Sequence, residues 1–172
     1  MRGAGLDSKW NASLRYVDTD VDRAKWRATL NYRVFSKLQV GVEFNAKADE
    51  VGPLVTWFLL TETSRRPALF FGTSSDRIGS PEGEQSYYLT AAKHLPDWPI
   101  SVYASLNYSE WDEGINFPFG GTVALGRGLA VQPMFDGDRT HLLLHYGGLP
   151  RVSVSALWAW LETPGISIST TF

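Results

Sequence analysis

Residues 24–34 read AKWRATLNYRV, and this stretch decides how the rest of the chain is interpreted. Apolar side chains occupy every second position from Ala24 to Val34, and the positions between them are polar or basic. Strict alternation with a period of two is typical of a β-strand that has one apolar and one polar face. Ordinary strands have about five or six residues, whereas a tilted strand that crosses a bilayer needs roughly 9–11. The length of this stretch therefore favours a membrane-crossing strand.

The same alternation recurs along the chain and predicts about twelve strands, within a range of ten to fourteen. The clearest repeats are expected at residues 10–17, 38–46 and 100–109. The other strands are expected at 54–61, from 68 onward, and at 86–94, 119–125, 129–135, 140–146, 152–161 and 166–172. No helical period is found.

The connections between these strands are too short for the crossovers that parallel strands need, so we expect an antiparallel sheet. A flat sheet of this width would leave two unpaired edges, which closure into an up-and-down barrel removes. The longer connections fall mostly at one rim and the tight turns at the other, as in transmembrane barrels. We therefore predict one domain over residues 1–172, a closed antiparallel up-and-down transmembrane β-barrel.

Charge is expected to divide between the two rims in the same way. The rim with the longer connections collects the acidic residues Asp18, Asp20, Asp22, Asp49, Glu50, Asp76, Glu82, Glu84, Asp112, Glu113, Asp136 and Asp138. The rim with the tight turns collects the basic residues Lys37, Arg65, Arg66, Arg127 and Arg151. An acidic mouth favours cations because it concentrates them near the entrance.

Composition narrows the functional classes. The chain has no cysteine, which excludes disulfides and thiolate metal sites. Its net charge of −2 gives no reason to expect nucleic-acid binding, and no apolar run reaches the length of a transmembrane helix. The first ten residues, MRGAGLDSKW, lack the apolar core of a signal peptide, so we expect a mature form, an engineered form or a piece of a longer chain.

The last expected strand places Ile166, Ile168, Thr170 and the terminal Phe172 on one face. This pattern resembles the carboxy-terminal assembly signal of bacterial outer-membrane β-barrel proteins, and the strand pattern of the whole chain is similar to that superfamily. The resemblance implies a Gram-negative-type outer membrane, contact with membrane lipid and lipopolysaccharide, and recognition of the signal by the barrel-insertion machinery. The missing signal peptide departs from that family.

The polar faces of the strands are expected to line the lumen. The candidate lumen residues are Arg15, Lys25, Arg27, Arg33, Glu43, Asn45, Asn107, Gln132, His141 and His145. They are interpreted either as a polar pathway for water and small solutes or as a plug of interlocking, paired side chains. Eight strands are just filled by side chains and sixteen leave a channel, so twelve strands leave both readings open.

The two histidines raise the question of catalysis. His141 and His145 lie four residues apart on one strand, about 13 Å by strand rise, which is too far for one metal ion. Ser153 and Ser155 on the next strand would supply nucleophiles, but nucleophilic catalysis also needs a base within reach and an orienting group. We favour lumen-lining histidines, with no catalytic residue, metal or cofactor.

The segment Asp18-x-Asp20-x-Asp22 resembles the start of a calcium loop, without the glycine and the distal glutamate of that motif. A solvated acidic loop is preferred over weak binding of divalent cations at the rim.

Aromatic residues on the apolar faces are expected to form girdles at the membrane interfaces. They are Trp10, Trp26, Tyr32, Phe44, Trp57, Tyr108, Trp158, Trp160 and Phe172.

Three functions follow from this pattern. The first is a narrow, porin-like passive channel for ions and small solutes. The second is a non-conducting barrel that anchors or supports a cell-envelope assembly through a protein partner. The third is a soluble barrel with a ligand cavity, like a lipocalin, in which every strand would be turned inside out. We favour a membrane barrel without enzymatic activity. Of the two membrane functions, we favour the channel over the non-conducting barrel.

Overall fold

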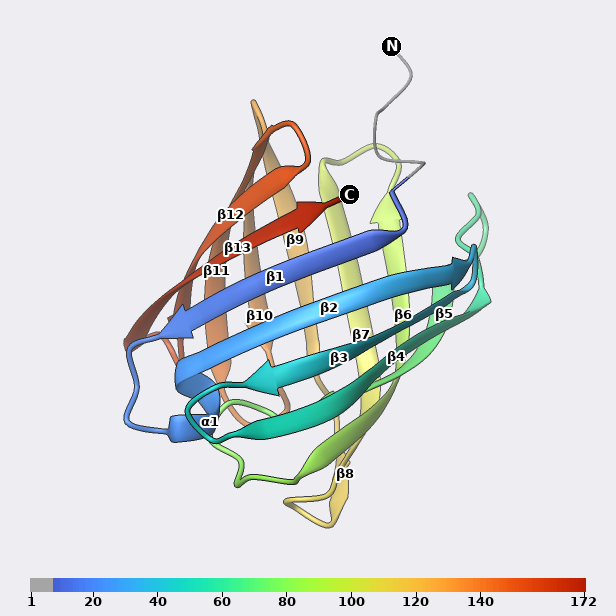
Figure 1. Ribbon diagram of the computed structural model, residues 1–172. Coiled ribbons are helices and arrows are strands. Elements are labelled where there is room, and N and C mark those ends of the chain that lie inside the picture. The colour runs from blue at the N-terminus through green and yellow to red at the C-terminus, as the bar shows by residue number, and fades with distance from the viewer. Residues whose placement is uncertain (1–7) are drawn as a thin grey trace.

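The computed structural model describes residues 8–172, which form a closed antiparallel barrel of twelve strands with one extra short strand (Figure 1). This confirms the predicted fold class. The strands are β1 (Trp10–Val17), β2 (Trp26–Phe35), β3 (Leu38–Asn45), β4 (Glu50–Leu60), β5 (Ala68–Ser75), β6 (Gln85–Leu95), β7 (Ile100–Ser109), β8 (Gly114–Asn116), β9 (Phe119–Gly126), β10 (Leu129–Phe135), β11 (Thr140–Leu149), β12 (Val152–Ala159) and β13 (Thr163–Thr171). The N-terminal stretch without a signal-peptide core lies mostly outside the described residues.

Strands pair in chain order around the ring, except that β7 pairs with both β8 and β9. The seam between β1 and β13 closes the barrel through antiparallel pairs from Asn11 opposite Thr171 to Val17 opposite Gly165. The blue and red strands lie side by side in Figure 1. Closure leaves no long unpaired edge in the wall, as expected for a meander of this width.

Three local features differ from the expectation. The chain from Asp22 to Lys25 forms one helical turn, α1, where a strand was expected to begin at Ala24. β4 begins at Glu50, within a segment expected to be a loop, because it pairs with the end of β3. The connection at residues 61–67, on the tight-turn rim, is longer than expected. None of the helices in residues 8–172 is long and apolar enough to cross a membrane.

Pro133 lies inside β10 without disrupting the wall. It pairs with Leu142 on β11, whereas the ladder to β9 has paired residues at Val131 and Met134 and none between them. Proline has no N–H to donate, so it is tolerated where the ladder is already interrupted.

The outer and inner faces of the wall have opposite compositions. On β7, the outward Leu106 is 50% exposed, whereas the inward Asn107 is only 7% exposed. Most of the buried side chains in residues 8–172 are polar, and the buried apolar ones are Val17, Ala24, Leu157 and Ala159. The barrel is therefore apolar outside and polar inside. This arrangement overturns the hypothesis of a soluble barrel with an apolar cavity, since such a barrel would bury its apolar faces.

Aromatic pairs mark both ends of the outer face of β1 and β2. Trp10 contacts Tyr32 at one end and Tyr16 contacts Trp26 at the other, with ring centroids 4.7 Å apart in each pair. The cross-strand pairs between them are small or aliphatic: Ala12 with Leu30, and Leu14 with Ala28. An aliphatic band between two aromatic ends is typical of a lipid-facing barrel surface.

Candidate functional site

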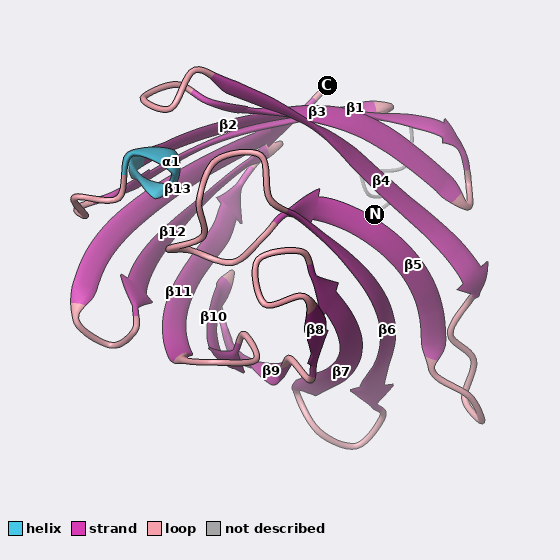
Figure 2. Cartoon of the chain, turned by 90° about the horizontal axis from the view of Figure 1, so that it is seen from below, coloured by secondary structure: helices cyan, strands magenta, loops and turns pink. Residues whose placement is uncertain are grey.

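The connection between β5 and β6, residues 76–84, crosses the mouth of the barrel (Figure 2). Its Ile78 packs against a cluster of Val17, Leu157 and Ala159 on β1 and β12. Strand β12 lies on the wall opposite β5, since the ring runs β5, β4, β3, β2, β1, β13, β12 in one direction. This connection, called the mouth loop below, therefore narrows the opening instead of projecting from the rim.

Arg23 of α1 holds the mouth loop in place. Its buried guanidinium donates hydrogen bonds to Ser80 Oγ and to two loop carbonyl oxygens, those of Pro81 (2.6 Å) and Glu84. It also pairs with Glu50, with 2.7 Å between Nε and Oε2. Breaking a shielded pair of this kind is costly because it leaves the other charge without a partner. The single turn of α1 thus serves to aim one arginine at the loop.

A second arginine fixes the start of the mouth loop to the connection after β7. Arg77 donates two hydrogen bonds to Asp112, at 2.5 and 2.8 Å, and its guanidinium lies 4.7 Å from the ring centroid of Trp111. The neighbouring Asp76 accepts a hydrogen bond from Ser109 Oγ at 2.6 Å. The hydrogen bonds from Arg77 hold the pKa of Asp112 below its usual value, although the partial burial of this carboxyl opposes the shift.

Behind the mouth loop the lumen keeps a cavity of about 430 Å³. Its charged lining consists of the arginines Arg15, Arg23, Arg27 and Arg77, and the aspartates Asp76 and Asp136. A second cavity of about 300 Å³ shares the segment 74–77, Met134 and Asp136 with the first. The twelve-stranded lumen is therefore partly open, between the filled eight-stranded barrel and the wide sixteen-stranded pore.

The structure brings several of the predicted lumen residues together. Arg15, Arg27, Asn45, His141 and His145 line the first cavity, and Asn107 lines the second. The other four predicted residues, Lys25, Arg33, Glu43 and Gln132, line neither cavity.

Those four have different surroundings. Glu43 is fully buried on the inner face, where it pairs with Arg27 and accepts a hydrogen bond from Asn45 at 3.0 Å. Gln132 Oε1 accepts a hydrogen bond from His145 Nε2 at 2.9 Å. Lys25 belongs to α1 instead of a strand, and Arg33 is exposed near the tight-turn rim.

His145 makes the contact with a serine that was considered for His141. Its Nδ1 lies 2.6 Å from Ser155 Oγ and its Nε2 lies 2.9 Å from Gln132 Oε1. With Gln132 accepting through its oxygen, Nε2 carries the proton and Nδ1 accepts from the serine hydroxyl. The orienting group is a neutral amide, which stabilises an imidazolium less than the carboxylate of a catalytic triad does. We interpret the trio as interlocked lumen side chains.

His141 and Ser153 have other partners. The Nε2 atom of His141 lies 2.7 Å from Asp136 Oδ2, and its Nδ1 accepts the backbone N–H of Trp160 at 3.3 Å. Ser153 bonds to Ser169 at 2.6 Å. Burial opposes ionisation of Asp136, but the bonds from His141 and two backbone N–H groups outweigh it and lower the pKa of this carboxyl. His141 therefore supports the hairpin at the mouth.

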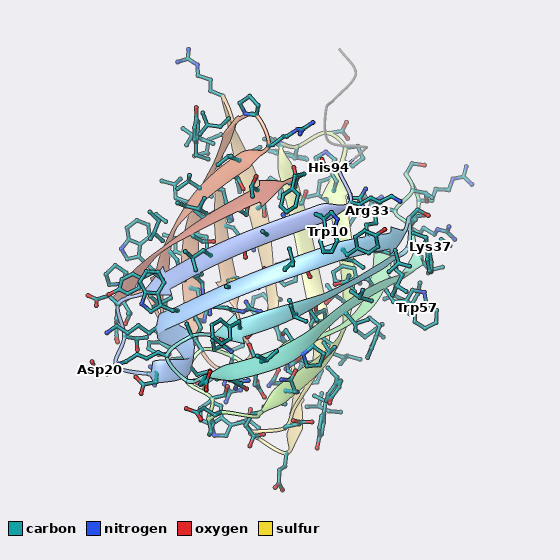
Figure 3. The ribbon with its side chains drawn as sticks, viewed as in Figure 1. Trp10, Asp20, Arg33, Lys37, Trp57 and His94 are labelled. Carbon is teal, nitrogen blue, oxygen red and sulfur yellow. The ribbon has the colours of Figure 1, made fainter. Side chains whose placement is uncertain are left out.

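Charge is distributed between the rims as expected from the connections. Asp20 lies at the end of the barrel that carries α1, whereas Arg33, Lys37 and His94 lie near the opposite end (Figure 3). In the acidic segment, Asp18 accepts a hydrogen bond from Tyr16 at 3.0 Å and Asp22 pairs with Lys47 at 2.7 Å. Within residues 8–172, no group of three or more histidine and acidic side chains is arranged to hold a metal ion.

Trp160 differs from the other aromatic residues expected on the outer surface. Its backbone has a φ of +57°, and Arg139 lies over its ring at 5.2 Å from the centroid. Trp160 also packs against the apolar cluster that receives Ile78. The left-handed turn after β12 thus directs this side chain to the mouth instead of the outer face of the wall.

Sequence reasoning did not identify the residues that hold the mouth loop, namely Arg23, Arg77, Ile78 and Ser80. One signal was present: Ile78 is a lone branched apolar residue within the long polar stretch TSSDRIGSPEGEQ. Such a residue in a polar loop indicates a docking point, but its partner on β12 is not predictable from local sequence.

Comparison with known proteins gives the following. No family model matches the chain, and no curated protein matches it. An engineered triple mutant of the Rh. blastica porin is similar in structure, with 14% identity over 86% of this chain and 55% of the porin, at a TM-score of 0.40. The low-pH structure of Pseudomonas putida OprB has 11% identity over 97% of this chain and 64% of that chain, at a TM-score of 0.39. The chain thus spans less than two thirds of the length of either structure.

Proposed function

We propose that the chain is an integral β-barrel of a Gram-negative-type outer membrane, and that it is a narrow passive channel for ions and small solutes. The observation that carries the proposal is the inverted wall, which exposes apolar side chains outside and encloses polar cavities of about 430 and 300 Å³. In water, an outer surface of this kind would be a large exposed apolar patch, whereas in a bilayer it would contact the apolar lipid chains.

The position of the mouth loop supports a narrow channel. It is held across the opening by the ion pair of Arg23 with Glu50 and by the packing of Ile78. Passage must therefore occur beside this loop, through a space lined by arginine, serine and histidine side chains. Small hydrated ions and small polar solutes fit this description better than large substrates do.

The channel is tested by single-channel recording in a planar bilayer with protein refolded from detergent. Discrete current steps are expected, and protein-free detergent is the control. Insertion is checked independently by heat-modifiable migration in gels and by protease protection. A protein that stays soluble and monomeric without detergent would overturn the membrane assignment.

A non-conducting barrel that supports an envelope assembly is the second candidate, and the docked mouth loop favours it. If the loop closes the opening completely, the protein inserts stably but carries no current. In that case the partner would be an envelope protein, which cross-linking in the membrane would identify. We propose lipid and lipopolysaccharide as neighbours of the barrel in both cases, and no nucleic acid.

The last strand is proposed as the signal for the barrel-insertion machinery. Ile166, Ile168 and Phe172 are exposed on the outer surface, Phe172 at 55%, and Thr170 continues their face. Deletion of Phe172 should reduce the amount of folded barrel in the outer membrane of an expression host, measured by heat-modifiable migration. Deletion of the equally apolar but distant Trp98 side chain (Trp98→Ala) is the control. Normal assembly without Phe172 would contradict the signal.

A further inference from the structure

A row of six inward side chains crosses the wall of the first cavity in direct register. It runs over β3, β2, β1, β13, β12 and β11. The members, called the lumen row, are Asn45, Arg27, Arg15, Ser167, Ser155 and His145. All six line the cavity of about 430 Å³, and none is acidic. Neighbouring strands lie about 4.8 Å apart, so the row forms a continuous polar band around half of the ring.

Arg15 is the centre of this row. It faces Arg27 on one side and Ser167 on the other, and it forms no ion pair with any carboxylate in residues 8–172. The Nε atoms of Arg15 and Arg27 are both buried without a hydrogen-bond partner, as are those of Arg23 and Arg77, which also line the cavity. Two adjacent guanidinium groups repel each other, and buried donors without partners are costly. Unsatisfied groups of this kind point to a bound ion or water.

The nearby carboxylates do not supply an ion-pair partner for Arg15. Glu43 is fully buried, and it is already bound by Arg27 and Asn45, which line the cavity. Asp76 and Asp136 line the same cavity, where Asp76 accepts a hydrogen bond from the neutral Ser109 hydroxyl and Asp136 pairs with His141. Within residues 8–172, Arg15 is therefore the arginine of the lumen row that forms no ion pair with a carboxylate.

The neighbouring hydroxyl groups are also occupied. Two residues along the same strands, and on the same face, Ser13 bonds to Thr29 at 2.7 Å and Ser153 bonds to Ser169 at 2.6 Å. These pairs satisfy each other across the strands and leave the guanidinium of Arg15 to face the cavity. A planar guanidinium presents a fork of N–H donors that matches the oxygens of a carboxylate or phosphate.

We propose that the lumen row binds a small oxyanion, of the phosphate or carboxylate type, between the guanidinium groups of Arg15 and Arg27. The inference rests on the proposed channel in one respect, because the anion must reach the lumen. It places an oxyanion site behind an acidic rim, in which Asp22, Glu50, Asp112, Asp136 and Asp138 form ion pairs.

The site is tested by isothermal titration of inorganic phosphate into the full chain refolded in detergent, at low ionic strength, with chloride at matched ionic strength as the reference. Phosphate is expected to bind and chloride to bind more weakly. Arg15→Gln should weaken phosphate binding by about tenfold or more, as expected for loss of charge-assisted hydrogen bonds. Arg33→Gln is the matched control. It removes an arginine side chain from the neighbouring strand β2, at an exposed position near the rim, and should leave the phosphate affinity unchanged.

Two further measurements exclude a merely structural role for Arg15. Without phosphate, Arg15→Gln should raise the thermal midpoint of unfolding, because it removes an unpaired charge beside Arg27. Glu43→Gln should strengthen phosphate binding, because it releases Arg27. Phosphate affinity that is the same in wild type and Arg15→Gln, or a lowered thermal midpoint in that variant, would overturn the site.

Single-channel recording separates this proposal from the proposed channel. Phosphate should reduce the chloride current of the wild type and should have a weaker effect on Arg15→Gln. Phosphate binding that depends on Arg15 without any current would support the site and contradict the channel. Current without phosphate binding would support the channel and overturn the site.

Discussion

The arginines at the mouth and the arginine in the wall are the same residue type in two different environments. Arg23 and Arg77 each have a carboxylate partner, Glu50 and Asp112, and each ties the mouth loop to another segment. Arg15 lies deeper in the same lumen and has no such partner in the described part of the chain. An arginine that is paired serves the structure, whereas one that is left unpaired in a cavity is available to a ligand.

The largest effect is expected when the ion pair of Arg23 with Glu50 at the mouth is removed. Arg23→Ala leaves the shielded Glu50 without its charged partner, with only the hydrogen bonds from Asn45 and the Gly83 N–H, and breaking a buried pair costs about 3–5 kcal/mol. The mouth loop should then detach, which should raise the single-channel conductance and increase cleavage by a protease that cuts after glutamate, at Glu82 and Glu84. Both readouts are measured on the refolded protein.

Lys47→Ala is the matched control at the same rim. Lys47 and Asp22 form an ion pair at 2.7 Å, but both side chains are about half exposed. Exposed pairs contribute about 0–1 kcal/mol, so this variant should behave like the wild type. A loop that stays resistant to the protease in Arg23→Ala would show that the ion pair is not what holds it.

A smaller effect is expected from the apolar contact. Ile78→Asn removes the side chain that packs on Leu157 and Ala159 across the barrel. Full burial of an isoleucine contributes about 1.5–3 kcal/mol and Ile78 is only partly buried, so the loop should open more often without detaching fully. Open-state fluctuations in the current should increase. Ile115→Asn, at an exposed position on β8 near the same rim, is the control and should not change the noise.

The smallest effect is expected from the pair of Arg77 with Asp112, because Asp112 is partly exposed. The hydrogen bonds from Arg77 lower the pKa of Asp112, with burial opposing them, so the folded pKa lies below the unfolded one. The pair stabilises the loop above the unfolded pKa of about 3.9 and loses this contribution as pH falls through the folded pKa.

Protease sensitivity of the loop should therefore rise below about pH 4 in the wild type. Asp112→Asn should be slightly more sensitive than the wild type at neutral pH, and its change on acidification should be smaller. Asp136 also has a lowered pKa, so part of the acid response should remain in the variant. An identical response in both proteins would contradict a role for Asp112.

Regular alternation allowed the wall to be predicted closely. The bounds of β1, β7 and β10 agree with the expected strands 10–17, 100–109 and 129–135. β4 was harder, because residues 54–60 are apolar on both faces and Gly52-Pro53 suggested a turn. In the structure Trp57 faces outward, whereas Phe58 contacts the Phe70 ring, with 5.2 Å between centroids. Pairing with β3 and packing against β5 decide which side chains of β4 point outward, which the apolar sequence of this strand left ambiguous.

The candidate site was predictable only as a set of residues. Alternation placed Arg15, Arg27, Asn45 and His145 on one face of their strands, and they line one cavity. Their partners were not predictable, because a strand pattern does not say which inward side chain meets which. His145 meets Ser155 and Gln132, while His141 meets Asp136, although the two histidines looked equivalent in the sequence.

The sequence by itself determined the strands, their two faces and the antiparallel order, because these depend on side-chain periodicity and on short connections between neighbours. It did not determine which face points inward, since alternation is the same in a soluble barrel and in a membrane barrel. Only closure of the ring through β1 and β13 decided that the charged faces share a lumen. Closure also brought Ile78 to β12 and set Arg15 beside Arg27 and Ser167, because these contacts join segments that are distant or oppositely directed in the chain.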